Sequence, residues 1–318
     1  MHSMRVALAV LGACVFVSAS ATNCLADVIY ASGVERRQLE RRGWSYEGAD
    51  GVMNWGKFNN TCVAGERQSP INFEGDELAI SSRPNLRWSN LMTPFNFTNN
   101  GHTVQMALVQ STPNLVSTEP DGRQYIVQQV HFHSPSEHHV DEHYYDLEAH
   151  FVHTTPDGKL NVIGVFFEVG EEENVWIGQF VDKLPPKNNT ITQVPSLDMT
   201  QIIDKLSTAQ FYSYTGSLTT PPCTEGVLWM VAREPLVISL GQLKKLREVM
   251  PFNSRPVQAN VASEPEAFVG KESKGSGQST SEESVARTVE GIYKSGASSL
   301  MGGRILSGVL ATAAALLL

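Results

Sequence analysis

The feature that most constrains this fold is a series of short strand-like segments separated by turn residues. Between Trp44 and Phe268, apolar residues alternate with polar ones or cluster with Val, Thr, Phe and Tyr in seven segments: residues 95–98, 102–109, 125–132, 147–153, 161–169, 211–215 and 227–233. Such patterns are typical of β-strands. Three pairs favour turns between them, namely Asn100-Gly101, Asp121-Gly122 and Asp157-Gly158. With no internal repeat and no long linker, the stretch is predicted to form one continuous domain.

Helical patterns are few and short. Ser239 and Gln242 form a capping-box pattern before residues 242–250, which Pro251 ends. Two further segments follow a capping residue: 202–206 after Asp198, and 175–184 after Asn174. We therefore predict an α+β domain that is mainly sheet, with small helices at its periphery.

The N-terminus has the pattern of an export signal. A short basic start precedes an apolar run at residues 6–17, and small residues follow before Asp27. This order predicts a signal peptide over residues 1–26, because the run is too short to span a bilayer comfortably. Two alternatives are a buried N-terminal helix and cleavage after Ala21, which would leave Cys24 as an odd thiol.

The C-terminus has the pattern of a lipid-anchor signal. Residues 270–299 are rich in Gly, Ser, Glu and Lys, which is typical of a flexible stalk that follows a domain over residues 27–269. Small residues, a short spacer and an apolar tail come next, the tail lying within residues 300–318. This combination indicates a glycolipid anchor, with a tail-anchored span as the alternative.

Cysteine and sequon positions agree with export to the cell surface or beyond. Removal of residues 1–26 takes away two of the four cysteines and leaves Cys62 and Cys223, which predicts one disulfide. Three glycosylation sequons begin at Asn59, Asn96 and Asn188. The formal net charge of −9 disfavours nucleic acid as a partner, because phosphate backbones repel an acidic surface.

Three histidines on two predicted strands form a candidate metal site. His131 and His133 stand two residues apart, so a strand would place both rings on one face. A neighbouring strand offers His150, with Glu148 two residues earlier on the same face. Imidazole nitrogen suits Zn²⁺, and three protein ligands leave a fourth position open for water.

Six motifs in the domain match one known family. They are Gly65-Glu66-Arg67-Gln68-Ser69-Pro70-Ile71-Asn72, Gln129-Val130-His131-Phe132-His133, Ser136-Glu137-His138, Glu148-Ala149-His150-Phe151-Val152-His153, Ser217-Leu218-Thr219-Thr220-Pro221-Pro222-Cys223 and Phe252-Asn253-Ser254-Arg255-Pro256-Val257-Gln258. In this set and order the chain resembles the α-class carbonic anhydrases. The resemblance implies a large, twisted, mostly antiparallel central sheet with zinc at the bottom of a conical cleft.

The resemblance also implies the reaction, the reversible hydration of CO₂ to bicarbonate and a proton by zinc-bound hydroxide. His131, His133 and His150 would hold the zinc, while Thr219 would accept a hydrogen bond from the hydroxide and donate one to Glu137. Gln129 and Glu148 would orient two of the rings, and a backbone carbonyl would orient the third.

Further positions match the substrate pocket and the proton path of the family. Thr220 would contact bicarbonate, and an apolar pocket for CO₂ would be formed by Val152, Val162, Leu218, Val227 and Trp229. His102 would shuttle the proton to buffer, since its ordinary pKa of about 6.5 suits that task. Tyr46, Asn100 and Gln105 would order the intervening waters; many members have Asn where this chain has Gln105.

Two other functions compete with CO₂ hydration. The first is a catalytically silent binding module, because some family members have lost zinc histidines. The second is a zinc esterase or other hydrolase with a different natural substrate. All three zinc histidines, Thr219 and Glu137 are present here, which favours the hydratase.

Overall fold

The computed structural model describes residues 43–259, except 77–78, 81–82, 109–115, 119–121 and 187–189. The predicted signal peptide, stalk and C-terminal tail, and the sequon at Asn188, lie outside the described residues. Within the described part, no helix is long and apolar enough to cross a membrane.

One large sheet dominates the described part of the chain, as predicted. Its strand order is β12 (Ile191–Val194), β4 (Phe95–Asn99), β5 (Val104–Ala107), β7 (Gln124–His133), β10 (Leu147–Thr154), β11 (Leu160–Gly170), β14 (Glu225–Ser239), β13 (Phe211–Ser217) and β2 (Ala79–Ile80). β3 (Asn85–Arg87) and β6 (Val116–Thr118) extend it beside β7. Its described pairs are antiparallel except β11 with β14, which is parallel.

Each of the seven predicted strand segments contains a strand. The strand within 102–109 is shorter than predicted, because Asn100 Oδ1 accepts from the backbone N–H groups of His102 and Thr103 and so keeps them in a turn. β14 is longer than predicted and continues past Pro235. The register with β11 shifts between Val165 and Phe167, and such a bulge is where a strand can accommodate proline.

A second, three-stranded sheet is formed by β1 (Asn72–Phe73), β8 (His139–Val140) and β9 (His143–Tyr144). Strands this short carry too few residues for a period-2 pattern to be recognised. These three strands were therefore not predicted, and neither were β2, β3, β6 and β12.

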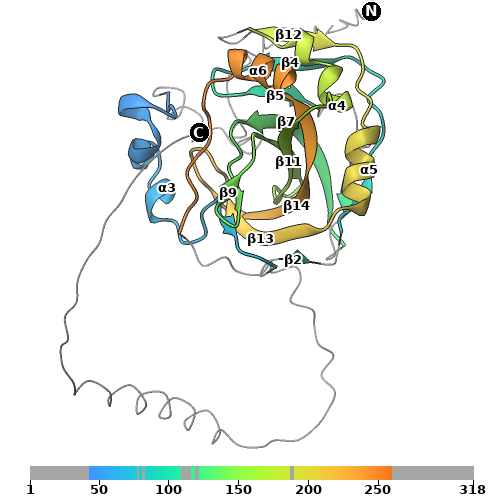
Figure 1. Cartoon of the computed structure of the whole chain (residues 1–318). Coiled ribbons are helices and arrows are strands. Elements are labelled where there is room, and N and C mark those ends of the chain that lie inside the picture. The colour runs from blue at the N-terminus through green and yellow to red at the C-terminus, as the bar shows by residue number, and fades with distance from the viewer. Residues whose placement is uncertain are drawn as a thin grey trace, which may run out of the picture. The chain divides into compact units, whose positions relative to one another are not determined.

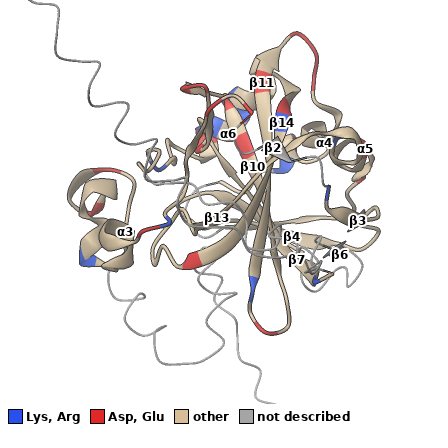
Figure 2. Ribbon diagram, turned by 90° about the horizontal axis from the view of Figure 1, so that it is seen from below, with Lys and Arg blue, Asp and Glu red and all other residues tan. Residues whose placement is uncertain are grey.

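Short helices lie at the periphery of the large sheet. They are η1 (Gly48–Asp50), η2 (Val52–Lys57), α3 (Thr61–Ala64), α4 (Val175–Gly178), η3 (Val181–Lys183), α5 (Thr200–Thr208) and α6 (Leu240–Val249). Figure 1 shows α4 and α5 on one side of the curved sheet and α3 beyond the other side. Lysines and arginines are interspersed with acidic residues over the described loops and helices (Figure 2).

Of the three predicted caps, Ser239 and Asn174 are confirmed, whereas Asp198 lies one residue before Met199, the N-cap of α5, whose own side chain makes no capping hydrogen bond. Ser239 and Gln242 form a capping box at the start of α6. Asn174 caps α4, but the continuous helix predicted over 175–184 is wrong. Phe180 leaves helical geometry with φ of −131° and packs edge-on against Trp176 in the core, so the helix stops and a separate turn follows.

The core divides between the two faces of the central strands. On one face Val130, Phe132 and Phe151 pack in a large apolar cluster beneath α4, where the fully buried Trp176 contacts two of these rings. Residues of the opposite parity on β7 and β10 therefore face the other side. That side carries the candidate metal-binding histidines.

Candidate metal centre

His131, His133 and His150 converge from two adjacent strands. β7 and β10 pair antiparallel with His131 opposite His150 and His133 opposite Glu148. The three ring centroids lie 4.7–5.1 Å apart, and one nitrogen of each ring lies within 4.8 Å of the others. The strand register therefore brings together the three histidines that the sequence analysis selected.

An oxygen atom that can accept a hydrogen bond lies close to the outer nitrogen of each ring. Gln129 Oε1 lies 2.9 Å from His131 Nδ1, and the Asn253 carbonyl lies 2.7 Å from His133 Nδ1. Glu148 Oε1 lies 2.8 Å from His150 Nε2. The opposite nitrogens, Nε2 of His131 and His133 and Nδ1 of His150, are left to face one another. Acceptors of this kind fix the orientation and tautomer of metal-binding histidines.

The chemistry of the donor set fits a zinc ion. Burial lowers the pKa of all three rings, that of His133 to about 3, so the rings are neutral near pH 7, as metal ligands must be. His133 Nε2 is buried with no hydrogen-bond partner in the described part, although Glu137 Oε2 lies 3.4 Å away. Three neutral imidazoles with an inward-facing unpaired nitrogen match the ligand set of a catalytic zinc site.

Glu148 is the centre of a buried polar network. Its Oε2 accepts from the backbone N–H groups of Glu137 and His138, at 2.8 and 3.0 Å. Its Oε1 lies 2.8 Å from both His138 Nδ1 and His150 Nε2. Burial alone would raise the pKa of Glu148, but the two histidines outweigh burial and hold this pKa well below its ordinary value. Gly164 leaves room for the network, since a Cβ there would lie 3.0 Å from Glu148 Oε1.

The network continues from His138 to the loop that carries Thr219. His138 Nε2 lies 2.7 Å from the Tyr214 hydroxyl, which donates to Ser69 Oγ at 2.8 Å. Ser69 Oγ also accepts from Ser217 N at 3.0 Å. His138 is thus a buried scaffold residue. Ser69, which belongs to the first family motif, and Tyr214, which no local pattern marks in the sequence, support the site.

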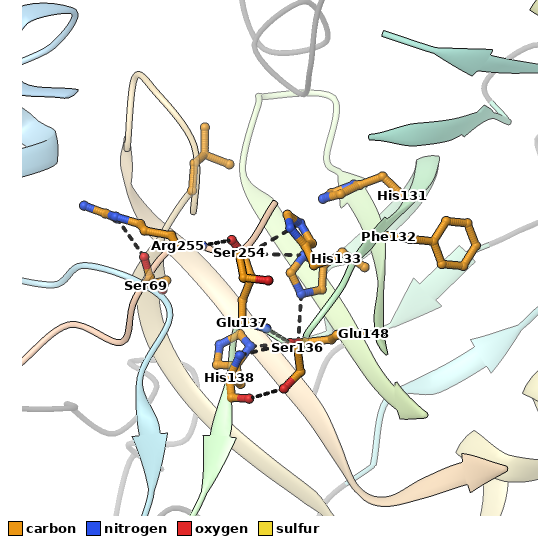
Figure 3. Close-up of polar contacts among 12 residues, drawn as sticks. Ser69, His131, Phe132, His133, Ser136, Glu137, His138, Glu148, Ser254 and Arg255 are labelled. Carbon is orange, nitrogen blue, oxygen red and sulfur yellow. Dashed lines mark hydrogen bonds and ion pairs between the residues drawn. The ribbon is translucent and has the colours of Figure 1, made fainter. Parts of the chain in front are cut away.

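Glu137 lies beside the candidate metal position. Its Oε1 accepts from Arg255 N at 3.0 Å, and its Oε2 lies 4.0 Å from His150 Nδ1 (Figure 3). Burial raises the pKa of Glu137, and Arg255 N and the neighbouring Thr219 hydroxyl oppose this rise. The structure therefore places Thr219 beside Glu137, the pair that the resemblance implied.

A cleft of about 430 Å³ opens over the three histidines. It is lined by Tyr46, Thr103, Gln105, Gln129, His131, His133, His150, Val152, Val162, Leu218, Thr219, Thr220 and Trp229. Val227 is buried in the cluster behind this wall rather than lining the cleft. Thr103, which the sequence analysis did not select, belongs to the lining.

His102 lies outside the cleft lining and stacks on Trp44. The two ring centroids are 3.8 Å apart with an interplanar angle of 8°, and the Tyr46 ring lies 6.5 Å from His102. Burial lowers the pKa of His102 to about 4 in this position. The Asn100 side chain holds the turn before His102 through backbone bonds. The structure therefore places His102 beside Tyr46, with its ring held by Trp44.

The predicted disulfide between Cys62 and Cys223 is present. Cys223 N donates to the Thr220 carbonyl at 2.8 Å, so the disulfide is attached directly to the loop that carries Thr219 and Thr220. The guanidinium of Arg255 donates to the Cys62 carbonyl at 2.8 Å. The disulfide thus connects the N-terminal segment to the rim of the cleft.

Comparisons with known proteins agree with this geometry. Residues 50–263 match the family model of the eukaryotic-type carbonic anhydrases. A carbonic anhydrase from Klebsiella pneumoniae is 37% identical over 68% of this chain and 87% of its own length, and alpha carbonic anhydrase 4 of Arabidopsis thaliana is 34% identical over 65% and 78%. The structure of Photobacterium profundum alpha-carbonic anhydrase superposes with a TM-score of 0.61 at 35% identity, over 68% of this chain and 96% of that one. The chain therefore belongs to the α-carbonic anhydrase family.

Proposed function

We propose that this chain is a zinc enzyme that reversibly hydrates CO₂ to bicarbonate and a proton. The observation that carries the proposal is the convergence of three buried, neutral imidazoles, each held from behind by an acceptor. His131, His133 and His150 would hold the ion. Zn²⁺ in such a site supplies Lewis-acid chemistry that makes water a nucleophile near neutral pH, an effect for which carbonic anhydrase is the standard example.

Thr219 and Glu137 orient the nucleophile in this proposal. In this proposal the Thr219 hydroxyl donates a hydrogen bond to the Glu137 carboxylate, so the hydroxyl oxygen is left as an acceptor toward the cleft. An O–H group bound there must donate to Thr219, which turns its own lone pair toward the substrate. Arg255 N fixes the carboxylate from the other side.

The cleft wall suits a small apolar substrate. Val152, Val162, Leu218 and Trp229 line it beside the histidines, and Val227 supports them from behind. A wall of this kind accommodates CO₂ without offering hydrogen bonds that would hold water in its place. Thr220, also in the lining, is the candidate contact for bicarbonate.

His102 is the proposed proton shuttle, with Tyr46 and Gln105 of the cleft wall ordering water on the way. A pKa of about 4 in the stacked position makes the ring a weak proton acceptor at neutral pH. We therefore propose that the ring accepts the proton after it swings off Trp44 toward solvent, where its pKa returns toward 6.5. Asn100 contributes by holding the turn.

Export is the second part of the proposal. A disulfide between Cys62 and Cys223 supports an oxidising compartment. We propose a signal peptide at 1–26, a catalytic domain over 27–269, a stalk over 270–299 and a glycolipid-anchor signal at 300–318. Asn96 is exposed and is the better glycan acceptor, whereas Asn59 is half-buried and accepts from Thr61 N through Oδ1.

The decisive experiment measures zinc content and CO₂ hydration on the same sample, before and after a chelator. One zinc per chain, with activity that the chelator removes and added zinc restores, supports the hydratase. A zinc-replete protein without CO₂ hydration would support the binding module. Ester hydrolysis that greatly exceeds CO₂ hydration would support the hydrolase.

A further inference from the structure

Asn253 follows α6 and bonds to four residues around the candidate metal centre. Its carbonyl accepts from His133 Nδ1 at 2.7 Å, and its Oδ1 accepts from Ser134 N at 2.9 Å. Its Nδ2 donates to the carbonyls of Phe132 at 2.8 Å and His102 at 3.1 Å. The residue is fully buried. A carboxamide has two N–H donors and an acceptor oxygen. In Asn253 both donors and the oxygen form hydrogen bonds with backbone atoms.

These bonds replace a missing part of the sheet. The described ladder between β5 and β7 reaches His131 and goes no further along β7. Beyond it, the Thr103 hydroxyl accepts from Phe132 N at 3.2 Å and donates to Phe132 O at 2.6 Å. Asn253 Nδ2 bonds the same Phe132 carbonyl and reaches across to His102. The alignment of His102 with the end of β7 therefore depends on two side chains.

The side chain of Asn253 also fixes the position of the backbone carbonyl of the same residue. Oδ1 and Nδ2 anchor the residue to Phe132 and Ser134, which flank His133 on both sides. The acceptor for the His133 ring is thereby fixed relative to the backbone from which that ring projects. Metal sites need ligands held within roughly 0.5 Å of the productive position. The hydrogen bonds of Asn253 to Phe132, His133 and Ser134 restrict the His133 ring in this way.

We propose that the Asn253 side chain is a positioning residue that fixes the His133 ring and, through the same amide group, the segment carrying His102. The inference rests on the proposed function for the identity of the metal site. It adds a physical connection between the metal ligand on β7 and the shuttle candidate in the turn before β5.

The test compares Asn253→Asp with a matched control. The substitution keeps an oxygen for Ser134 N but turns the donor that faces Phe132 O and His102 O into an acceptor. Asn174→Asp is the control, because Asn174 is equally buried, accepts from Ile177 N and donates to Val237 O at 2.7 Å, while serving as the cap of α4. Both variants exchange one buried amide donor for an oxygen.

Two measurements separate positioning from general destabilisation. Co²⁺ affinity should be about 10–100-fold lower in Asn253→Asp, the usual range for partners of metal-binding histidines. Transfer of Co²⁺ to a chelator should therefore be faster, and the visible Co²⁺ spectrum should change. Amide hydrogen exchange at residues 102–104 of the metal-free protein should also accelerate. Asn174→Asp should change neither, even where it lowers the melting temperature by a similar amount.

The outcomes are distinguishable from failure of the proposed function. Unchanged exchange at residues 102–104, or metal release as slow as in the wild type, overturns the inference. The exchange measurement uses metal-free protein. It therefore tests whether Asn253 fixes the segment that carries His102 even if the wild type binds no zinc. Should Asn253→Asp fail to fold, Asn253→Ser is measured in the same way, with the same direction and a smaller change expected.

Discussion

Removal of the disulfide should destabilise the domain more than any single surface change. Cys62 and Cys223 are 161 residues apart in the sequence, so the bond closes a very long loop in the unfolded chain. The loop-entropy relation gives about 5 kcal/mol for such a loop, at the upper end of the 2–5 kcal/mol usually measured. For a domain of this size, about 5 kcal/mol corresponds to a melting temperature roughly 10–20 °C lower.

The assay compares the wild type with the Cys62→Ser/Cys223→Ser double variant by urea unfolding and calorimetry. The wild type measured with a reductant is the control, since reduction breaks the same disulfide without any substitution. An unfolding free energy within about 1 kcal/mol of the wild type would refute the reasoning. CO₂ hydration should fall as well, because Cys223 N bonds the Thr220 carbonyl and the freed loop carries Thr219. Zinc content should not change, since the three histidines lie on strands.

Three further predictions concern single side chains. Thr219→Val should slow CO₂ hydration about 10–150-fold with zinc retained, because a hydrogen bond to the buried Glu137 contributes about 1.5–3 kcal/mol. Thr219→Ser keeps the hydroxyl and is the control. Full activity of the Val variant would contradict the proposed role of Thr219 in orienting the nucleophile. His102→Ala should slow turnover mainly in weak buffer, and added imidazole should restore the rate; absence of this rescue would contradict the shuttle role of His102. In a related test, Trp44→Ala should raise the pKa of His102 from about 4 toward 6.5, measured by NMR titration. Burial lowers the pKa of His153 to about 4, so between pH 6.5 and 4 the unfolded chain binds a proton that the folded chain excludes. Stability should therefore fall as the pH is lowered through this range, by about 3 kcal/mol in total, and His153→Phe should remove that component; equal pH slopes in urea unfolding would count against it.

Local pattern was sufficient for seven of the strands and for the choice of the three candidate ligands. The alternation of residues 125–132 and 147–153 predicted strands, and the spacing of His131 and His133 placed both rings on one face. Val130 and Phe132 then had to face the core, and they do so beneath α4. These features depend on neighbours two to four residues apart, which a sequence shows directly.

Pairing between distant segments was not accessible in the same way. The register that sets His131 opposite His150 depends on the fit of whole strands. The acceptor of the His133 ring is the carbonyl of Asn253, 120 residues further along the chain. Asn253 belongs to a family motif, but no local pattern assigns its carbonyl to that ring. The stacking of His102 on Trp44 and the break of the helix at Phe180 also depend on what surrounds each ring after folding.

The sequence by itself therefore determined where the longer strands form and which side chains can bind a metal, because periodicity and residue chemistry are properties of short segments. Only the tertiary structure decided which acceptor holds each ring, where the shuttle candidate rests and how the disulfide meets the cleft. These features depend on contacts between residues far apart in the chain, and such contacts exist only once the sheet has formed and packed against its core.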